Sequence, residues 1–134
     1  VDSHKLTPTV SSKSKFLFKN DFSCFKKKKS FFSMTAHIIY IDIDKINTAT
    51  HSTKIIKLIR NKLRFRDIII SDDISMKALK YDLITNAKKS LLAGCNLVLY
   101  CAGNIKDNLK LIKSVPYIDQ FTAKKTSEIY KILR

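Results

Sequence analysis

Two adjacent carboxylates follow an apolar run and are the residues best suited to chemistry. Residues 67–70 (DIII) form a continuous β-branched run typical of a buried strand, and the run ends in Ser71-Asp72-Asp73. A buried carboxylate is costly unless it has a partner. Because ligands bind at the carboxyl ends of parallel strands, Asp72 and Asp73 are candidate site residues. The alternative is that one of them, Asp73 more readily than Asp72, caps a helix near Ser75.

A second polar cluster, Asp2-Ser3-His4, opens the chain. An Asp two residues from a His can hydrogen-bond the imidazole ring. Such a bond fixes the tautomer and makes the ring a better proton shuttle. This spacing is common by chance, so it indicates a proton-transfer group only together with further evidence.

The remaining candidates favour structural roles. His37 stands within an apolar run, which is typical of a core or pocket-wall histidine, and it lacks partners at metal-ligand spacing. Met76 is interpreted as a packing residue beside the end of a strand. The sequence contains no G-x-G-x-x-G, P-loop or G-x-S-x-G motif and no C-x-x-C pair. We therefore expect no cofactor and no metal.

Apolar runs alternate with helical patterns along the chain. Besides residues 67–70, strands are expected at 36–43 and 96–101. Helices are expected at about 52–64, capped by Ser52, and at about 75–93, ended by Gly94. The alternation indicates right-handed β-α-β crossovers and a parallel sheet covered on both faces.

Three further helices are predicted around these elements. One lies within residues 15–32, where Phe18, Phe22 and Phe25 share a helical face. One starts at Asn104 or Asp107. The last is capped by Thr122. The apolar residues expected to be buried in the last two are Leu109 and Ile112, and Ile129, Ile132 and Leu133.

Composition limits the class of protein. The chain has 134 residues, 45% of them hydrophobic, and a net charge of +15. A basic chain is a candidate for nucleic-acid binding, but 22 of the 26 basic residues are Lys, and the Arg side chains that read base edges are scarce. No apolar run approaches the roughly 18 residues of a membrane span. The odd number of three cysteines fits a reducing cytoplasm, so we expect a cytoplasmic protein without nucleic-acid or membrane partners.

Four segments together resemble the bacterial β-N-acetylhexosaminidases of glycoside hydrolase family 3. Residues 34–40 (MTAHIIY) resemble the sixth-strand segment of that family, and residues 69–76 (IISDDISM) resemble its nucleophile segment on strand seven. Residues 93–99 (AGCNLVL) are similar to its strand-eight entry, and residues 1–4 (VDSH) to the end of its catalytic loop. The four segments occur in the family's order.

The resemblance implies a retaining enzyme that releases terminal N-acetylglucosamine from peptidoglycan fragments, a step of cell-wall recycling. By position, Asp72 would be the nucleophile, His4 the general acid/base and Asp2 the residue that orients His4. His37 and Met76 would line the substrate pocket. The implied partner is an N-acetylglucosamine-containing saccharide.

The resemblance covers only part of the family's fold, because a closed (β/α)8 barrel needs roughly 250 residues. We expect α/β architecture, a partial TIM barrel of about the last three β/α units. Residues 1–33 would be the end of the catalytic loop plus a basic Phe/Lys-rich helix or linker, and residues 34–134 the C-terminal portion of the barrel. Such a chain is expected to be a truncated or split-gene fragment, inactive alone or completed by an upstream barrel fragment.

The alternative is a small basic α/β protein that binds nucleic acid, or an interaction module that docks through its Phe-rich segment.

Overall fold

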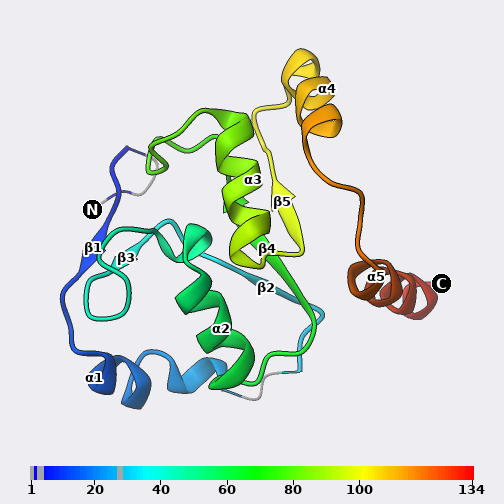
Figure 1. Ribbon diagram of the computed structural model, residues 1–134. Helices are drawn as coiled ribbons and strands as arrows, with labels where there is room; N and C mark the ends of the chain where they lie inside the picture. The colour runs from blue at the N-terminus through cyan, green and yellow to red at the C-terminus, as the bar shows by residue number, and fades with distance from the viewer. Residues whose placement is uncertain (1, 3–4, 27–28) are drawn as a thin grey trace.

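The computed structural model describes residues 2, 5–26 and 29–134 and arranges the strands in two parallel sheets (Figure 1). The smaller sheet pairs β1 with β3, and the larger one has the order β2-β4-β5. Every pairing is parallel, so the expected α/β fold with parallel strands is confirmed. The strands are β1 (Thr9–Val10), β2 (Phe32–Met34), β3 (Ile39–Tyr40), β4 (Ile68–Asp73) and β5 (Leu97–Leu99).

Each strand of the larger sheet leads along the chain to a helix. The helices are α1 (Ser14–Lys19), α2 (Thr53–Asn61), α3 (Leu83–Ala93), α4 (Ile105–Ser114) and α5 (Gln120–Ile132), with short 3-10 turns η1 (Ser23–Phe25) and η2 (Ala49–His51). None of the helices in the described part of the chain is both long and apolar enough to cross a membrane.

The predicted strand at residues 36–43 is wrong in position. The sheet contact comes earlier, where β2 runs beside β4 with Phe32 opposite Ile68. Within the predicted range only β3 is a strand, and it pairs with β1. The chain between β2 and β3 instead buries Thr35 and His37, which form hydrogen bonds with the hydroxyl of Thr50.

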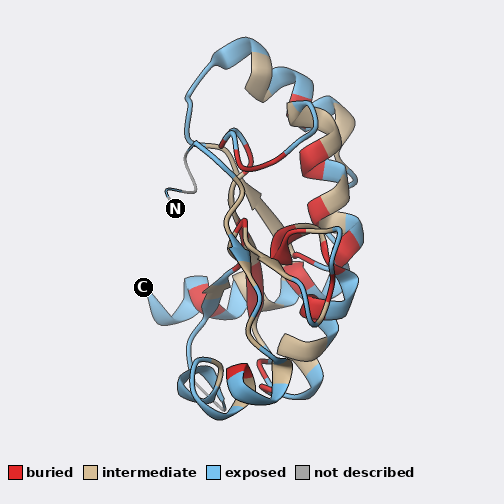
Figure 2. Ribbon diagram, turned by 90° about the vertical axis from the view of Figure 1, so that its left-hand side faces the viewer, coloured by how far each residue is buried: buried red, intermediate tan, exposed pale blue. Residues whose placement is uncertain are grey.

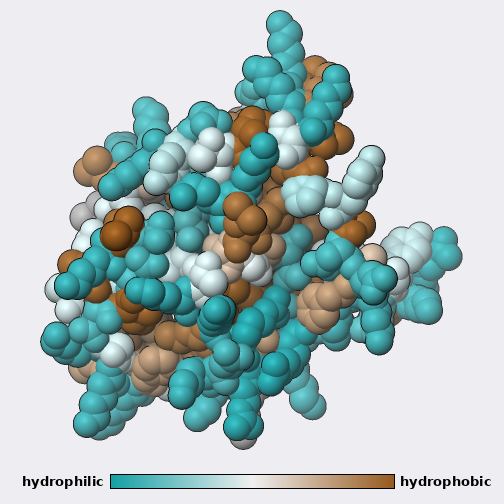
Figure 3. All heavy atoms as spheres, in the orientation of Figure 1, coloured by the Kyte–Doolittle hydropathy of each residue, from teal (hydrophilic) through white to brown (hydrophobic). Residues whose placement is uncertain are grey.

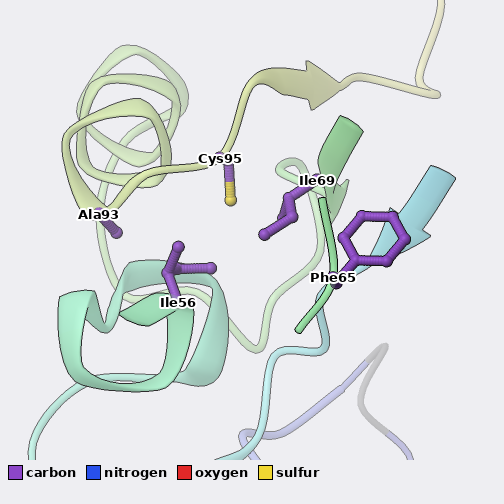
Figure 4. Packing of buried hydrophobic residues seen from close by; sticks show 5 residues of the cluster. All are labelled: Ile56, Phe65, Ile69, Ala93 and Cys95. Carbon is purple, nitrogen blue, oxygen red and sulfur yellow. The ribbon is translucent and has the colours of Figure 1, made fainter. Parts of the chain in front are cut away.

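Helices α2 and α3 pack together on one side of the larger sheet (Figures 1 and 2). A buried cluster joins the helices to β4: it consists of Ile56, Phe65, Ile69, Ala93 and Cys95 (Figure 4). The predicted helix ends here are confirmed. The Ser52 hydroxyl accepts a hydrogen bond from Ile55 N–H, and Gly94 ends α3 with a φ of 112°.

Helix α3 begins later than predicted. The region from Ser75 to Asp82 is a turn, and the Asp82 carboxylate caps α3 by accepting bonds from the N–H groups of Ile84 and Thr85. Asp73 caps no helix, because its carboxylate is bound to Ser75 at the end of β4. The capping interpretation of Asp73 is therefore wrong.

The predicted helix within residues 15–32 is interrupted. It breaks into α1 and η1, although the Phe18 and Phe22 rings still meet edge-to-face with centroids 5.5 Å apart. Phe22 also contacts Tyr40, whereas Phe25 is exposed.

Helices α4 and α5 are capped by Asn104 and Asp119, whose side chains accept bonds from N–H groups of the first turn. The predicted cap Thr122 is wrong, because Thr122 lies within α5 and its N–H donates to the Asp119 carboxylate at 2.6 Å. Of the residues predicted to be buried on these two helices, only Ile129 is buried. Leu111 is buried on α4, but the expected core residues Leu109, Ile112, Ile132 and Leu133 are exposed.

Candidate active site

The two carboxylates lie in β4 itself, at its carboxyl end. The strand extends to Asp73, beyond the expected end at Ile70, and its register against β5 shifts between these two residues. Ser71 is fully buried at this irregularity, where its hydroxyl oxygen accepts a hydrogen bond from Leu99 N–H at 2.9 Å. The Ser71 hydroxyl therefore takes the place of a backbone carbonyl as acceptor for Leu99 N–H, and β4 continues past the irregularity.

Asp73 is held by several donors. Its carboxylate accepts bonds from Ser75 N–H at 3.0 Å, from the Ser75 hydroxyl at 2.8 Å and from Cys101 N–H at 3.2 Å. Partial burial alone would raise the pKa of the Asp73 carboxyl, but these hydrogen bonds outweigh it and the pKa is lowered. Asp73 therefore ties the end of β4 to Cys101, two residues after the end of β5.

Asp72 is held less tightly. It is half-buried, and within the described part of the chain its carboxylate accepts one hydrogen bond, from Asp73 N–H at 2.8 Å. The second carboxylate oxygen has no hydrogen-bond donor among those residues. Of the two adjacent carboxylates, Asp72 accepts fewer hydrogen bonds from the described residues.

His37 fixes the backbone behind these carboxylates. It is 1% exposed; Nε2 lies 2.9 Å from the Asp73 carbonyl oxygen and Nδ1 lies 2.8 Å from Thr50 Oγ1. A carbonyl can only accept, so Nε2–H donates to Asp73. The Thr50 hydroxyl lies within hydrogen-bonding distance of both Nδ1 and the Ala36 carbonyl, at 2.8 and 3.2 Å. The Thr35 hydroxyl lies 2.9 Å from that of Thr50 and extends this buried chain of bonds. Both ring nitrogens are thus engaged within the protein.

The N-terminal segment approaches the loop that follows β4. The Thr7 hydroxyl donates to the Ala78 carbonyl at 2.6 Å, and the two segments lie side by side at the upper left of Figure 1. Asp2 belongs to this segment, and its carbonyl accepts bonds from Lys5 and Leu6 N–H groups. His4 lies outside the described residues, so its pairing with Asp2 stays a prediction.

Met76 lies in the same loop. It is 9% exposed, its N–H donates to the Asp73 carbonyl at 3.1 Å, and it lines a cavity of about 450 Å³ together with Ser75 and Tyr100. The geometry therefore places Met76 beside the carboxylate end of β4.

Sequence reasoning missed the hydroxyl groups that assemble this region. Thr50 and Thr7 have no motif around them, and their partners are distant along the chain. Of these hydroxyl residues, only Thr35 could have been noticed in the sequence, because it lies within residues 34–40, which resemble a segment of the family.

The described part of the chain contains no cluster of three or more His, Cys, Asp or Glu residues arranged to hold a metal ion. Burial raises the pKa of the Cys95 thiol to about 12, which makes it unreactive.

Comparisons with known proteins identify the family of the chain. The family description "Glycosyl hydrolase family 3 N terminal domain" matches residues 1–128. A β-hexosaminidase of Actinobacillus succinogenes is 33% identical in an alignment 130 residues long that covers 89% of this chain and 38% of the relative. One from Haemophilus influenzae is 32% identical in an alignment 128 residues long that covers 87% of this chain and 36% of the relative. The chain thus spans little more than a third of these relatives.

Solved structures have the same fold. CbsA from Thermotoga neapolitana superposes with a TM-score of 0.79 at 27% identity, over 99% of this chain and 33% of that protein. NagZ from Neisseria gonorrhoeae, in complex with N-trifluoroacetyl-D-glucosamine, has a TM-score of 0.77 at 23% identity over 94% of this chain and 37% of that protein. With a family match over nearly its whole length, the chain belongs to glycosyl hydrolase family 3.

Proposed function

We propose that this chain supplies the nucleophile of a retaining β-N-acetylhexosaminidase that hydrolyses terminal N-acetylglucosamine linkages in peptidoglycan fragments. The observation that carries the proposal is the placement of Asp72 in a family 3 fold. It stands half-buried at the carboxyl end of a parallel strand, with one hydrogen bond from the described residues, while the neighbouring Asp73 is held in place.

The proposed reaction has two displacement steps. In the first, a carboxylate oxygen of Asp72 attacks the anomeric carbon, the glycosidic C–O bond breaks, and His4 protonates the leaving oxygen. In the second, His4 takes a proton from water, the water oxygen attacks the anomeric carbon, and the bond to Asp72 breaks. Two inversions retain the configuration of the sugar, with a loop imidazole in place of the second carboxyl group of the usual scheme.

The contact between Thr7 and Ala78 supports this division of roles. It holds Thr7, five residues after Asp2, against the loop that follows Asp72. Asp2 would orient the His4 ring and favour its protonated form when the leaving group departs. His37 would keep Asp72 in position through the Asp73 carbonyl, and Met76 would line the adjoining pocket.

The active unit needs more polypeptide than this chain contains. Its relatives are more than twice as long, and a closed barrel needs roughly 250 residues. We therefore propose that this chain is the C-terminal portion of the barrel. It would be inactive alone and completed by an upstream barrel fragment, and it would function in cytoplasmic cell-wall recycling.

In the test, this chain is co-expressed with a second polypeptide. That polypeptide is the part of the Haemophilus influenzae β-hexosaminidase that does not align with this chain. A chromogenic β-N-acetylglucosaminide reports activity. We expect hydrolysis by the pair and none by this chain alone. Asp72→Ala should reduce kcat at least about 10⁴-fold, because no covalent intermediate can form, while Asp73→Ala should retain more activity. Unchanged turnover in the Asp72→Ala pair, or turnover by this chain alone, would refute the proposal.

A further inference from the structure

A cavity of about 590 Å³ lies where β4 begins, at the other end of that strand from Asp72. Its walls come from residues 29–31 before β2, from residues 64–67 before β4, and from α5. Hydrophilic side chains predominate at this lower right part of the molecule, around α5 (Figure 3). In an extended strand the step from Asp67 to Asp72 spans about 17 Å, so the cavity is separate from the candidate active site. Its size is suited to a small molecule.

The acidic side chains that line this cavity are already paired. Lys125 on α5 lies 2.8 Å from the Asp67 carboxylate and 3.3 Å from the Glu128 carboxylate. Both carboxylates therefore have a cation of their own.

Three further cations line the cavity without such partners. Lys29, Arg64 and Arg66 form no ion pair and no side-chain hydrogen bond within the described part of the chain. Only four of the 26 basic residues are Arg, and two of those four lie here. A guanidinium group binds phosphate oxygens through two parallel hydrogen bonds. This basic cavity therefore suits a ligand with several negative charges, and phosphates in particular.

The backbone that carries the two arginines is held in place. Phe65, between them, is 5% exposed and packs in the buried cluster of Figure 4. The Arg60 guanidinium donates to the Phe65 carbonyl at 3.3 Å and to the Asp67 carbonyl at 2.6 Å. Arg64 and Arg66 therefore extend from a fixed segment, which lowers the entropy cost of binding a ligand.

Arg64 has an unfavourable backbone conformation. Its φ is 59°, and it is the only non-glycine residue in the described part of the chain with a positive φ. Glycine or asparagine adopts this left-handed conformation more readily than arginine does, and the Arg64 side chain is exposed. Such strain is found at ligand sites, where the side chain is needed for binding.

Apolar side chains form the rest of the basic cavity. Phe31 and Ile132 line it beside the cations and are 43% and 64% exposed. A base stacks on an aromatic ring, and apolar surface of this kind gains by being covered. The ligand that fits best therefore combines phosphates with a flat, weakly polar ring.

We propose that the basic cavity binds a nucleoside diphosphate. The phosphates lie on Arg64, Arg66 and Lys29, and the base lies against Phe31 and Ile132. Recognition is by side chains, because the chain has no glycine-rich phosphate-binding motif. The site lies at the opposite end of β4 from Asp72, and the inference does not depend on the proposed hydrolysis.

The test measures binding directly, by isothermal titration of the 134-residue chain with ADP, pyrophosphate and adenosine. We expect ADP to bind with one site per chain. Pyrophosphate should bind about 10-fold more weakly, because it lacks the stacked base, and adenosine should show no measurable binding. Equal affinities for ADP and pyrophosphate, several ADP sites per chain, or no ADP binding would overturn the proposal.

Charge-removing variants test the location of the site. Arg64→Asn should weaken ADP binding at least about 10-fold and leave the thermal midpoint unchanged or higher, because asparagine accepts the left-handed backbone. Arg66→Gln, with an ordinary backbone, should weaken ADP binding by a similar factor and gives a second measurement.

Lys54→Gln is the matched control. Lys54 is exposed in the first turn of α2, at the other end of that helix from Arg64, and its substitution removes the same charge. We expect an ADP affinity within about 2-fold of the unmodified chain, because the screened charge is far from the cavity. Equal losses in Lys54→Gln, Arg64→Asn and Arg66→Gln would show general attraction of anions to a basic chain and would overturn the assigned site.

Discussion

At the scale of single residues, Asp72 and Asp73 are neighbours with different surroundings. The sequence located the pair, because two carboxylates after an apolar run are poorly explained by packing. It could not show which one is held, because the donors to Asp73 come from Ser75 and from Cys101, which lies 28 residues after Asp73 in the chain. The difference between Asp72 and Asp73 therefore depends on the pairing of β4 with β5, which brings Cys101 near Asp73.

Asp73→Asn should destabilise the fold, and Asp72→Asn should do so much less. The Asp73→Asn variant loses the carboxylate charge that accepts hydrogen bonds from Ser75 and Cys101. This loss should lower the free energy of unfolding by about 1–3 kcal/mol, measured by urea denaturation at pH 7. The pKa of Asp73 is lowered in the folded state, so this stabilisation exists above its ordinary pKa of 3.8 and disappears as the pH falls below it. Equal losses in both variants would contradict the assigned contacts.

At the scale of elements, the parallel strands and the caps at Ser52 and Gly94 were predictable from local patterns. The start of α3 was not, because Ser75 and Asp82 are both good capping residues and the choice depends on the bond between Ser75 and Asp73. The buried face of α4 was also mispredicted. The regular stripe that includes Leu109 is exposed, and Leu111 packs inward.

Gly94 joins α3 to β5 where a side chain has no room. Its φ is 112°, and an added Cβ would lie 2.9 Å from Ile56 Cγ2. Gly94→Ala should cost about 2–4 kcal/mol of unfolding free energy, because backbone strain and a core clash add together. Gly103→Ala is the control, with a φ of 70° and no atom within 4 Å, and should cost about 1 kcal/mol. A smaller loss at Gly94 than at Gly103 would contradict the packing.

His51 connects η2 to α3 and should make stability depend on pH. Burial lowers its pKa to about 4, although its hydrogen bond to the Asn86 carbonyl opposes the shift. Because the unfolded chain takes up a proton near pH 6.5, stability should be full above that pH and fall by up to about 3 kcal/mol as the pH drops toward 4. Urea denaturation at pH 7 and pH 5 measures this loss. His51→Gln should reduce the difference, and an equal pH dependence in the variant would assign it to other groups.

At the scale of the whole molecule, composition alone favoured two interpretations of the +15 charge, a nucleic-acid surface or a solvated one. The fold adds what composition lacks, namely a parallel sheet and the basic cavity where β4 begins. The family membership predicted from four short segments is confirmed. Comparison with the relatives adds that the chain spans little more than a third of their length.

The most direct test of the account is to trap the sugar on the enzyme. The co-expressed pair is treated with a fluorinated N-acetylglucosaminyl substrate, which forms the covalent intermediate faster than it is hydrolysed, and the chain is then digested and analysed by mass spectrometry. The account predicts one added sugar on the peptide that contains Asp72, located on that residue and absent in Asp72→Asn. A label on Asp73 or on another residue, or continued turnover in Asp72→Asn, would contradict it.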